Sequence, residues 1–209
     1  MQLSYYRTKI ERIIHNLLAK VAFSLGFHEK LYLGVFKTLP TPFPKRPLNV
    51  LFLCTGNICR SPYASEVFSQ RLPEELSQKV RSASAGLLTS AGKPADPTMV
   101  KVAQAKGFDL TKHLTQKATE ELVSHSDILI IMEPLHLRLV KKQFPGQEHK
   151  CLYLGSFSVK RKQPLIVDDP FGKPSAVAVQ TASHIDSGIQ SLINKISSVF
   201  NSSNVEPSN

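Results

Sequence analysis

Residues 49–62, NVLFLCTGNICRSP, constrain the fold more than any other stretch of this chain. The apolar run Val50–Leu53 is typical of a buried strand, and it ends in Cys54. A short polar loop closes on Arg60, and the dipeptide Ser61–Pro62 then favours the start of a helix. Backbone N–H groups in such a loop, together with the helix N-terminus, bind anions. The stretch therefore predicts an anion-binding loop with a thiol at its base.

The composition is that of a globular chain with a basic N-terminal part. The 209 residues are 42% hydrophobic and 20% charged, which suits one domain plus an appendage. Residues 1–46 hold eight basic and two acidic residues, a net charge of +6 out of the chain's +10. This balance favours acidic partners. We expect no nucleic-acid binding, because no basic stretch is interleaved with aromatic residues and no nucleic-acid motif appears.

The cysteine count indicates a reducing compartment. Three cysteines in a chain of this length do not make a disulfide framework, so we expect a cytoplasmic protein. No run of 18 apolar residues exists to span a membrane. The basic and apolar start is not expected to act as a secretion signal, because Lys20 interrupts it and no small-residue cleavage site follows.

The chain divides into three parts: an N-terminal extension (residues 1–47), a domain (48–200) and a disordered tail (201–209). Apolar residues at helical spacing over 8–25 predict an amphipathic helix, and the proline-rich segment 40–47 predicts a linker. The helix either packs on the domain or on a partner protein, or lies on an anionic membrane surface through residues 8–27. The second alternative would make the protein membrane-peripheral.

From Leu48 onward, strands and helices alternate. We expect strands over residues 49–54, 80–84, 127–132 and 150–154. We expect helices over residues 61–70 (extending as far as 77), 97–106 with Gly107 as its cap, 119–125, 135–144 and 182–200. Alternation of this kind predicts a parallel sheet covered by helices on both faces, a three-layer α/β/α fold.

Cys54 has the surroundings expected of a nucleophile. A free thiol with a pKa near 8.5 is mostly protonated at neutral pH, but a helix N-terminus, backbone donors and Arg60 would favour the thiolate. The same groups would hold a phosphate dianion, with Arg60 binding two oxygens in a bidentate fork. We expect the loop from Thr55 to Ser61 to bind phosphate without any metal or other cofactor.

Three residues of the loop have individual expected roles. Gly56 permits a turn that a side chain would obstruct, and Asn57 tolerates a left-handed conformation while its amide holds the loop from inside. Ser61 is placed to donate a hydrogen bond to the Cys54 sulfur.

The general acid is expected to be Asp169, which precedes Pro170 in a loop after the last strand. Such loops meet at the carboxyl ends of parallel strands, where Cys54 also lies.

Several motifs together resemble the low-molecular-weight protein tyrosine phosphatase family. They cover residues 48 to 200 in order: CTGNICRSP (54–62), SAG (84–86), GKPADP (92–97), GFDLTKH (107–113), DILIIM (127–132) followed by Glu133, and DDPFG (168–172). The resemblance implies a four-stranded parallel sheet, no metal and hydrolysis of a phosphocysteine intermediate. It makes Cys54 the nucleophile, Arg60 and the loop amides of residues 55–61 the phosphate-binding groups, and Asp169 the acid and later the base.

The resemblance also implies supporting roles. Asn57, Ser61, Ser84 and His113 would form a hydrogen-bonded set bracing the loop. Cys59 matches a second family cysteine that pairs reversibly with Cys54 and protects it from over-oxidation.

The sequence departs from the family's pattern around the substrate. The loop after SAG, LLTSAG, has no aromatic residue, and Phe171 stands where tyrosine is common, leaving one aromatic wall. Glu133 occupies a position that is often aspartate. Family members that hydrolyse phosphoarginine tend to have threonine at the position of Ile58, so Ile58 favours phosphotyrosine in proteins as the substrate.

Three alternatives remain beside a tyrosine phosphatase. One is a protein arginine phosphatase of the same fold. The second is a thioredoxin-coupled arsenate reductase, which needs two resolving cysteines downstream, whereas Cys151 is the only later cysteine. The third is a non-catalytic phosphoprotein-binding module, although nothing essential is missing from the loop.

Overall fold

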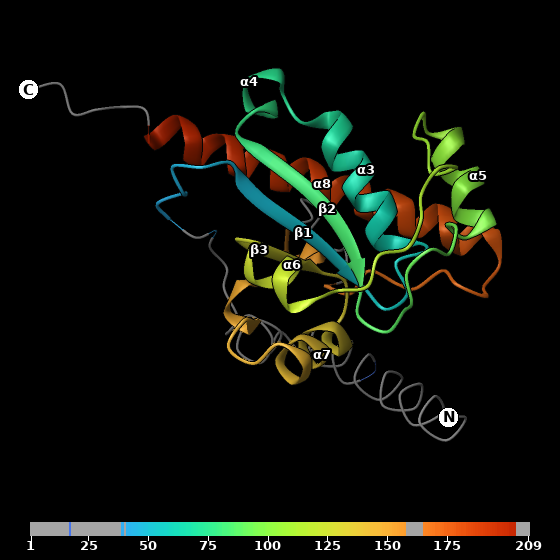
Figure 1. Ribbon diagram of the computed structural model, residues 1–209. Coiled ribbons are helices and arrows are strands. Elements are labelled where there is room, and N and C mark those ends of the chain that lie inside the picture. Colours follow the sequence, from blue (N-terminus) through green and yellow to red (C-terminus); the bar gives the residue numbers. More distant parts are fainter. Residues whose placement is uncertain (1–16, 18–38, 40, 158–164, 204–209) are drawn as a thin grey trace, which may run out of the picture.

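The computed structural model describes residues 17, 39, 41–157 and 165–203 (Figure 1). Four parallel strands form one sheet in the order β2–β1–β3–β4. The strands are β1 (Leu48–Cys54), β2 (Val80–Gly86), β3 (Ile128–Ile131) and β4 (Cys151–Tyr153). The predicted α/β/α fold with a four-stranded parallel sheet is confirmed, and the predicted strands differ from these only at their ends.

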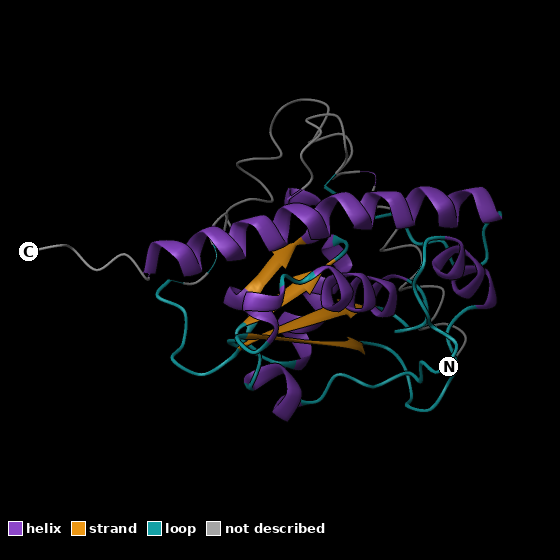
Figure 2. Cartoon of the chain, turned by 90° about the horizontal axis from the view of Figure 1, so that it is seen from above, coloured by secondary structure: helices purple, strands orange, loops and turns teal. Residues whose placement is uncertain are grey.

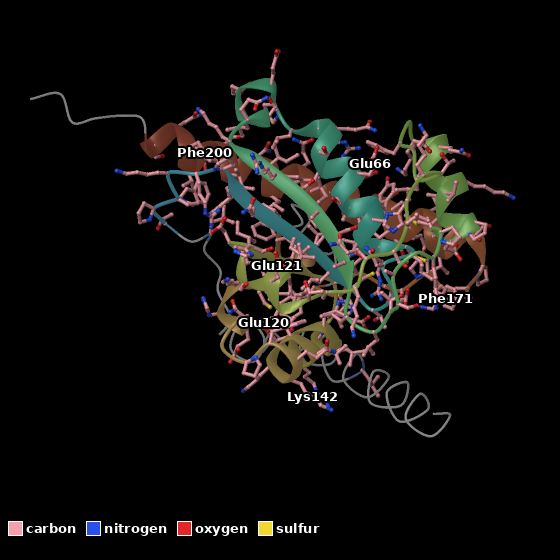
Figure 3. The ribbon with its side chains drawn as sticks, viewed as in Figure 1. Glu66, Glu120, Glu121, Lys142, Phe171 and Phe200 are labelled. Carbon is pink, nitrogen blue, oxygen red and sulfur yellow. The ribbon has the colours of Figure 1, made fainter. Side chains whose placement is uncertain are left out.

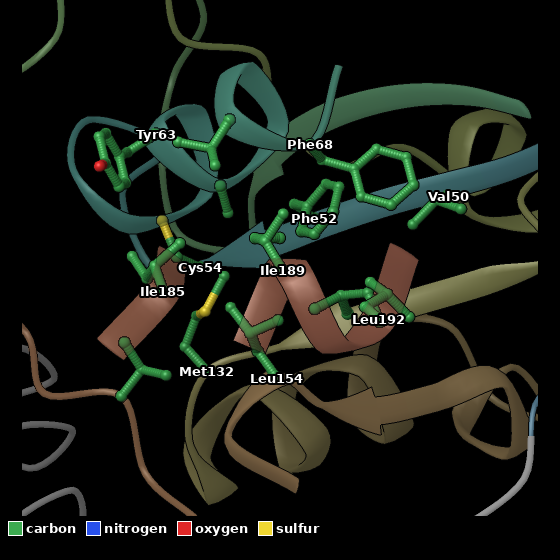
Figure 4. Close-up of a cluster of buried hydrophobic side chains, with 14 of the residues drawn as sticks. Val50, Phe52, Cys54, Tyr63, Phe68, Met132, Leu154, Ile185, Ile189 and Leu192 are labelled. Carbon is green, nitrogen blue, oxygen red and sulfur yellow. The ribbon is translucent and has the colours of Figure 1, made fainter. Parts of the chain in front are cut away.

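Helices cover both faces of the sheet because side chains along β1 alternate in direction. Val50 and Phe52 pack with α3 (Arg60–Arg71), α5 (Pro97–Ala105) and α8 (Ser175–Ser203) in one apolar cluster. Figure 4 shows this cluster, with Phe68 from α3 and Leu192 from α8 beside the β1 side chains. Leu51 and Leu53 face a second cluster with α6 (Glu120–Ser124) and α7 (Pro134–Gln143). The central position of β1 explains its apolar run, since both of its faces are buried.

The predicted range 61–70 of the first helix is confirmed, but its extension to residue 77 and the predicted start of the closing helix are wrong, and a proline lies at each observed boundary. The first helix does not continue to residue 77: α3 ends at Arg71, and α4 (Glu74–Ser77) follows as a separate turn. Leu72 has ψ 127° because it precedes Pro73, which disfavours the helical conformation. The closing helix begins at Ser175, directly after Pro174, rather than at residue 182. Figure 2 shows this long helix running across the sheet.

The ends of α5 follow local sequence signals. The Asp96 carboxylate accepts hydrogen bonds from the N–H groups of Thr98 and Met99 and caps the N-terminus. At the other end Gly107 has φ +86°, a left-handed conformation that closes the helix as predicted. The remaining short elements are the 3₁₀ turns η1 (Glu148–Lys150) and η2 (Leu154–Phe157).

The proline-rich segment is attached to the domain instead of connecting freely to it. Residues 41–47 contain no helix, as predicted. The Phe43 ring lies 4.8 Å from the Phe200 ring of α8, and Arg46 makes two 2.8 Å hydrogen bonds to the carboxylate of Asp127. Asp127 also accepts from the backbone N–H of Asn49, so the segment is fixed beside the start of β1.

The ends of the chain lie largely outside the described residues. Of the amphipathic helix predicted over 8–25, only Leu17 is described, and it is helical. Helix α8 extends to Ser203, so residues 201–203, which were assigned to the tail, are helical, while residues 204–209 are not described. Within the described ranges, no helix combines the length and apolar character needed to cross a bilayer.

Candidate active site

The loop between β1 and α3 lies at the carboxyl end of the central strand. Cys54 is the last residue of β1, pairs with Gly86 of β2 and is almost fully buried. Asn57 has φ +52°, the left-handed conformation predicted for it. A Cβ on Gly86 would lie 2.5 Å from Cγ2 of Thr89 and 3.1 Å from the backbone nitrogen of Asn57. Glycine at position 86 therefore lets β2 approach the loop closely.

The carbonyl groups of the loop bond to groups outside it. Leu87, Leu88 and Asp96 donate backbone N–H groups to the carbonyls of residues 54, 55 and 58, each at 2.9 Å. Nε2 of His113 lies 2.7 Å from the Asn57 carbonyl. With its carbonyls held in this way, the loop has its backbone N–H groups available for an anion.

Asn57 braces the loop from inside. Its Nδ2 donates to the hydroxyls of Ser61 and Ser84, both at 2.9 Å, and its Oδ1 accepts from the N–H of Gln116 at 2.8 Å. Together with the His113 contact, these bonds bring the four predicted supporting residues into one network. Gln116 is an additional member that the sequence did not suggest.

Two donors face the sulfur of Cys54. The N–H of Asn57 lies 3.2 Å from Sγ, and the Ser61 hydroxyl lies 3.0 Å from it. Because the Ser61 oxygen already accepts from Asn57, its hydrogen is available for the sulfur, which is nearer than the Ala85 carbonyl at 3.5 Å. These two contacts place Oγ of Ser61 and the N–H of Asn57 directly beside the sulfur.

Arg60 is buried between two carboxylates from distant parts of the chain. Its Nη1 donates to Oε1 of Glu133 at 2.7 Å and to the Val167 carbonyl at 3.2 Å, and its Nη2 lies 3.1 Å from Oδ2 of Asp169. Burial opposes the charge, but Asp169 and Glu133 outweigh it and raise the pKa of Arg60. Its Nε is buried and has no hydrogen-bond partner among the described residues. A buried donor in this state fits an oxyanion in the loop.

The Asp169 loop also carries the predicted aromatic wall. The backbone N–H of Phe171 lies 3.4 Å from Oδ1 of Asp169, and the Phe171 side chain is 59% exposed. Figure 3 shows Phe171 at the end of the molecule where β2 ends. Leu88, after β2, is also largely exposed, so apolar side chains lie on two loops beside the site.

The other cysteines are buried thiols. Cys59 lies in the loop, and burial raises its pKa above the ordinary range. Cys151 in β4 is fully buried, and burial raises its pKa to about 12. A fully buried thiol in a strand does not suit the resolving role that an arsenate reductase requires. Across the described parts of the chain, no group of three or more His, Cys, Asp or Glu side chains is arranged to hold a metal.

Two buried residues of the site were missed or undervalued in the sequence. In the sequence Glu133 differs from the family only as a replacement for aspartate, yet its carboxylate holds Arg60. His136 was not singled out, although its Nε2 lies 3.1 Å from Oγ1 of Thr55. Both residues follow β3, which neighbours β1 in the sheet. Because the carboxyl ends of neighbouring parallel strands lie at the same edge of a sheet, a polar residue directly after β3 is a candidate for the site.

Comparison with known proteins agrees with this geometry. The family model described as low molecular weight phosphotyrosine protein phosphatase matches residues 49–201. The probable low molecular weight protein-tyrosine-phosphatase EpsP of Ralstonia solanacearum is 30% identical over 147 residues, which are 70% of this chain and 94% of EpsP. The Wzb phosphatase of Escherichia coli K12 is 33% identical over 125 residues, covering 60% of this chain and 79% of Wzb.

Solved structures give the same result. The YwlE arginine phosphatase from Geobacillus stearothermophilus superposes with a TM-score of 0.67 at 25% identity, covering 77% of this chain and 99% of YwlE. The Erwinia amylovora tyrosine phosphatase AmsI superposes with a TM-score of 0.65 at 27% identity, covering 75% of this chain and 97% of AmsI.

The loop that begins at Cys54 lies at the carboxyl end of a parallel α/β sheet, the arrangement predicted for a phosphate-binding site with a cysteine at its base. The chain belongs to the low molecular weight phosphotyrosine protein phosphatase family, a family of hydrolases that act on phosphoproteins.

Proposed function

We propose that this protein hydrolyses phosphotyrosine in proteins, with Cys54 as nucleophile and Asp169 as general acid. The observation that carries the proposal is the 3.1 Å contact between Nη2 of Arg60 and Oδ2 of Asp169. It joins the loop that begins at Cys54 to the Asp–Pro loop near the end of the domain. Nucleophile, phosphate-binding cation and acid thus share one site.

The reaction follows from the roles of these groups. The Cys54 thiolate attacks phosphorus, an S–P bond forms, and the bond from phosphorus to the tyrosine oxygen breaks while Asp169 protonates that oxygen. Water then attacks the phosphocysteine, gives a proton to Asp169, and releases inorganic phosphate and the thiolate. Arg60 and the loop N–H groups of residues 55–61 stabilise the equatorial oxygens in both steps.

Phosphate binding changes the surroundings of Asp169. Before substrate arrives, Asp169 is paired with Arg60. A phosphate dianion bound by Arg60 replaces part of that interaction and places negative charge beside the carboxylate, which favours its protonated form. The carboxyl group then has the proton that the leaving oxygen needs.

The apolar surroundings favour tyrosine over arginine phosphate. Ile58 lies in the loop, and the exposed Phe171 ring offers a face to an aromatic substrate. Phosphoarginine is the second candidate, favoured by the similarity to the YwlE arginine phosphatase. Initial rates on phosphotyrosine, phosphoarginine and phosphoserine peptides, without added metal, test the proposal. Preferred hydrolysis of phosphoarginine would replace it with the second candidate.

We further propose that Cys59 protects Cys54 by forming a reversible disulfide with it under oxidising conditions. Both are free thiols, and Cys59 lies within the loop that Cys54 begins. This role suits a protein of the reducing cytoplasm, where we place this one.

Residues 1–47 are proposed to be an extension outside the catalytic domain, contacting an anionic membrane or a partner protein through residues 8–27. The basic charge of the segment supports this proposal. Full-length protein with Arg12→Glu and Lys20→Glu should bind anionic liposomes less than wild type, whereas Lys101→Glu on α5 should bind equally. Equal binding by all three proteins would remove the membrane alternative.

A further inference from the structure

His136 is a fully buried polar side chain beside the phosphate-binding loop. It lies in the first turn of α7, just after β3 ends. Because β3 neighbours β1, the imidazole sits on the side of the loop that faces away from β2. The network of Asn57 approaches the loop from the β2 side, through Ser84. His136 thus contacts the loop from the side of β3, whereas Ser84 contacts it from the side of β2.

The hydrogen bonds of His136 fix its tautomer. The backbone N–H of Met132 donates to Nδ1 at 3.2 Å, so Nδ1 carries no hydrogen. The neutral ring therefore carries its hydrogen on Nε2. Nε2 lies 3.1 Å from Oγ1 of Thr55 and 3.4 Å from Oε1 of Glu133. The ring is therefore a donor to Oγ1 of Thr55, with Oε1 of Glu133 also close to the same nitrogen.

Both oxygen atoms belong to the phosphate-binding machinery. Thr55 directly follows Cys54 and is the first residue of the loop. Oε1 of Glu133 is also the atom that accepts from Nη1 of Arg60 at 2.7 Å. One imidazole thus contacts the start of the loop and the carboxylate that orients the arginine at its end.

We propose that His136 is a positioning residue for phosphate binding, and this inference rests on the proposed function. As a neutral Nε2–H donor it orients the Thr55 hydroxyl and fixes the Glu133 oxygen that holds Arg60. This keeps the Arg60 guanidinium oriented toward the same phosphate position as the loop N–H groups. Such a residue touches neither substrate nor sulfur and acts through the groups that do.

Two substitutions separate the donor role from simple core packing. In His136→Gln, the side-chain NH₂ group takes the place of Nε2 and still donates to Thr55 and Glu133. In His136→Asn, the shorter amide replaces Nδ1, accepts from Met132 and leaves both oxygens without this donor. We expect His136→Asn to lower kcat/KM roughly 10-fold or more, the effect of one hydrogen bond to a charged group. His136→Gln should keep most of the activity.

A double-mutant cycle identifies the path of the effect. Thr55→Val removes the hydroxyl while keeping the shape of the side chain. The double variant Thr55→Val/His136→Asn should lose less kcat/KM than the product of the two single fold-losses. The exposed His125→Asn is the matched control and should behave as wild type. All variants are compared at equal folded fractions, established by thermal unfolding, so that a loss of stability is not counted as a loss of positioning.

Inorganic phosphate binding, measured by calorimetry, makes the test independent of turnover. His136→Asn should bind phosphate more weakly than His136→Gln and wild type. If His136→Asn unfolds more easily but keeps both kcat/KM and phosphate affinity, or if Gln and Asn variants lose equally, the positioning role is wrong. If wild type binds phosphate but hydrolyses no phosphoester, the proposed function fails, while the binding comparison still decides the role of His136.

Discussion

Nη2 of Arg60 and Oδ2 of Asp169 lie 3.1 Å apart, which couples the phosphate-binding cation directly to the proposed acid. The Arg60 side chain is buried, and only 16% of the Asp169 side chain is exposed. An ion pair with this little exposure is poorly screened by water. In the proposed mechanism, substrate phosphate competes with Asp169 for the guanidinium, and the released carboxyl group is left beside the leaving oxygen.

Removing the acid should have an effect that depends on the leaving group. Asp169→Asn should lower kcat on a phosphotyrosine peptide by roughly 10²–10⁴-fold, the usual contribution of general-acid catalysis. The loss on p-nitrophenyl phosphate should be smaller, because its weakly basic leaving group needs less protonation. Asp168→Asn, a change at the neighbouring exposed carboxylate, is the control. Equal losses in both variants would rule out a specific role for Asp169.

Substrate choice should respond to residue 58. Ile58→Thr should lower the ratio of phosphotyrosine to phosphoarginine hydrolysis, because it removes apolar contact area beside the phosphate and adds a hydroxyl. One or two methylene equivalents of apolar contact correspond to roughly a 10-fold change in this ratio. Competition between the two phosphopeptides in one reaction measures the ratio directly. An unchanged ratio would place the selectivity elsewhere, with the Phe171 loop as the next position to vary.

Oxidation should be reversible only while Cys59 is present. After peroxide treatment, dithiothreitol should restore wild-type activity, because a Cys54–Cys59 disulfide prevents over-oxidation of Cys54. In Cys59→Ser the sulfenic acid on Cys54 has no neighbouring thiol, so inactivation should become irreversible. Cys151→Ala should recover as wild type does. Recovery of Cys59→Ser to the wild-type level would show that another mechanism protects the nucleophile.

Buried His184 should make the fold sensitive to acid. Burial lowers its pKa, an effect that Asp168 partly opposes, and its Nε2 has no hydrogen-bond partner among the described residues. The unfolded chain therefore binds a proton more readily than the folded one, so stability is present above the ordinary histidine pKa of about 6.5 and is lost as the pH falls below it.

Urea unfolding at pH 7.5 and pH 5.5 measures this contribution. His184→Gln should lose less unfolding free energy between the two pH values than wild type, whereas the exposed His149→Gln should lose as much. A parallel loss in all three proteins would assign the acid sensitivity to other groups.

Local sequence predicted the centre of the site, and long-range contacts decided its surroundings. Cys54, Asn57, Ser61 and Arg60 lie within eight consecutive residues, so one strand–loop–helix unit fixes their arrangement. Glu133 has a role only because β3 lies next to β1, and no local pattern carries that pairing.

The dependence on long-range contacts also explains why the sequence did not predict the docking of the proline-rich segment. The docking of Phe43 on Phe200 joins the two ends of the described domain, and a proline-rich sequence says nothing of it. The sequence predicts a later start for α8 than residue 175 because residues 175–181 lack the strong apolar periodicity of the rest of that helix.

The central claim is that a phosphoryl group passes through Cys54, and trapping it is the most direct test. With p-nitrophenyl phosphate, Asp169→Ala should still undergo the first step but hydrolyse the intermediate slowly, since no base activates the water. Rapid quenching followed by peptide mass spectrometry should then find one phosphoryl group on the peptide that contains Cys54, and none in Asp169→Ala/Cys54→Ala. An unlabelled Cys54 peptide during turnover, or full activity in Cys54→Ser, would contradict the account.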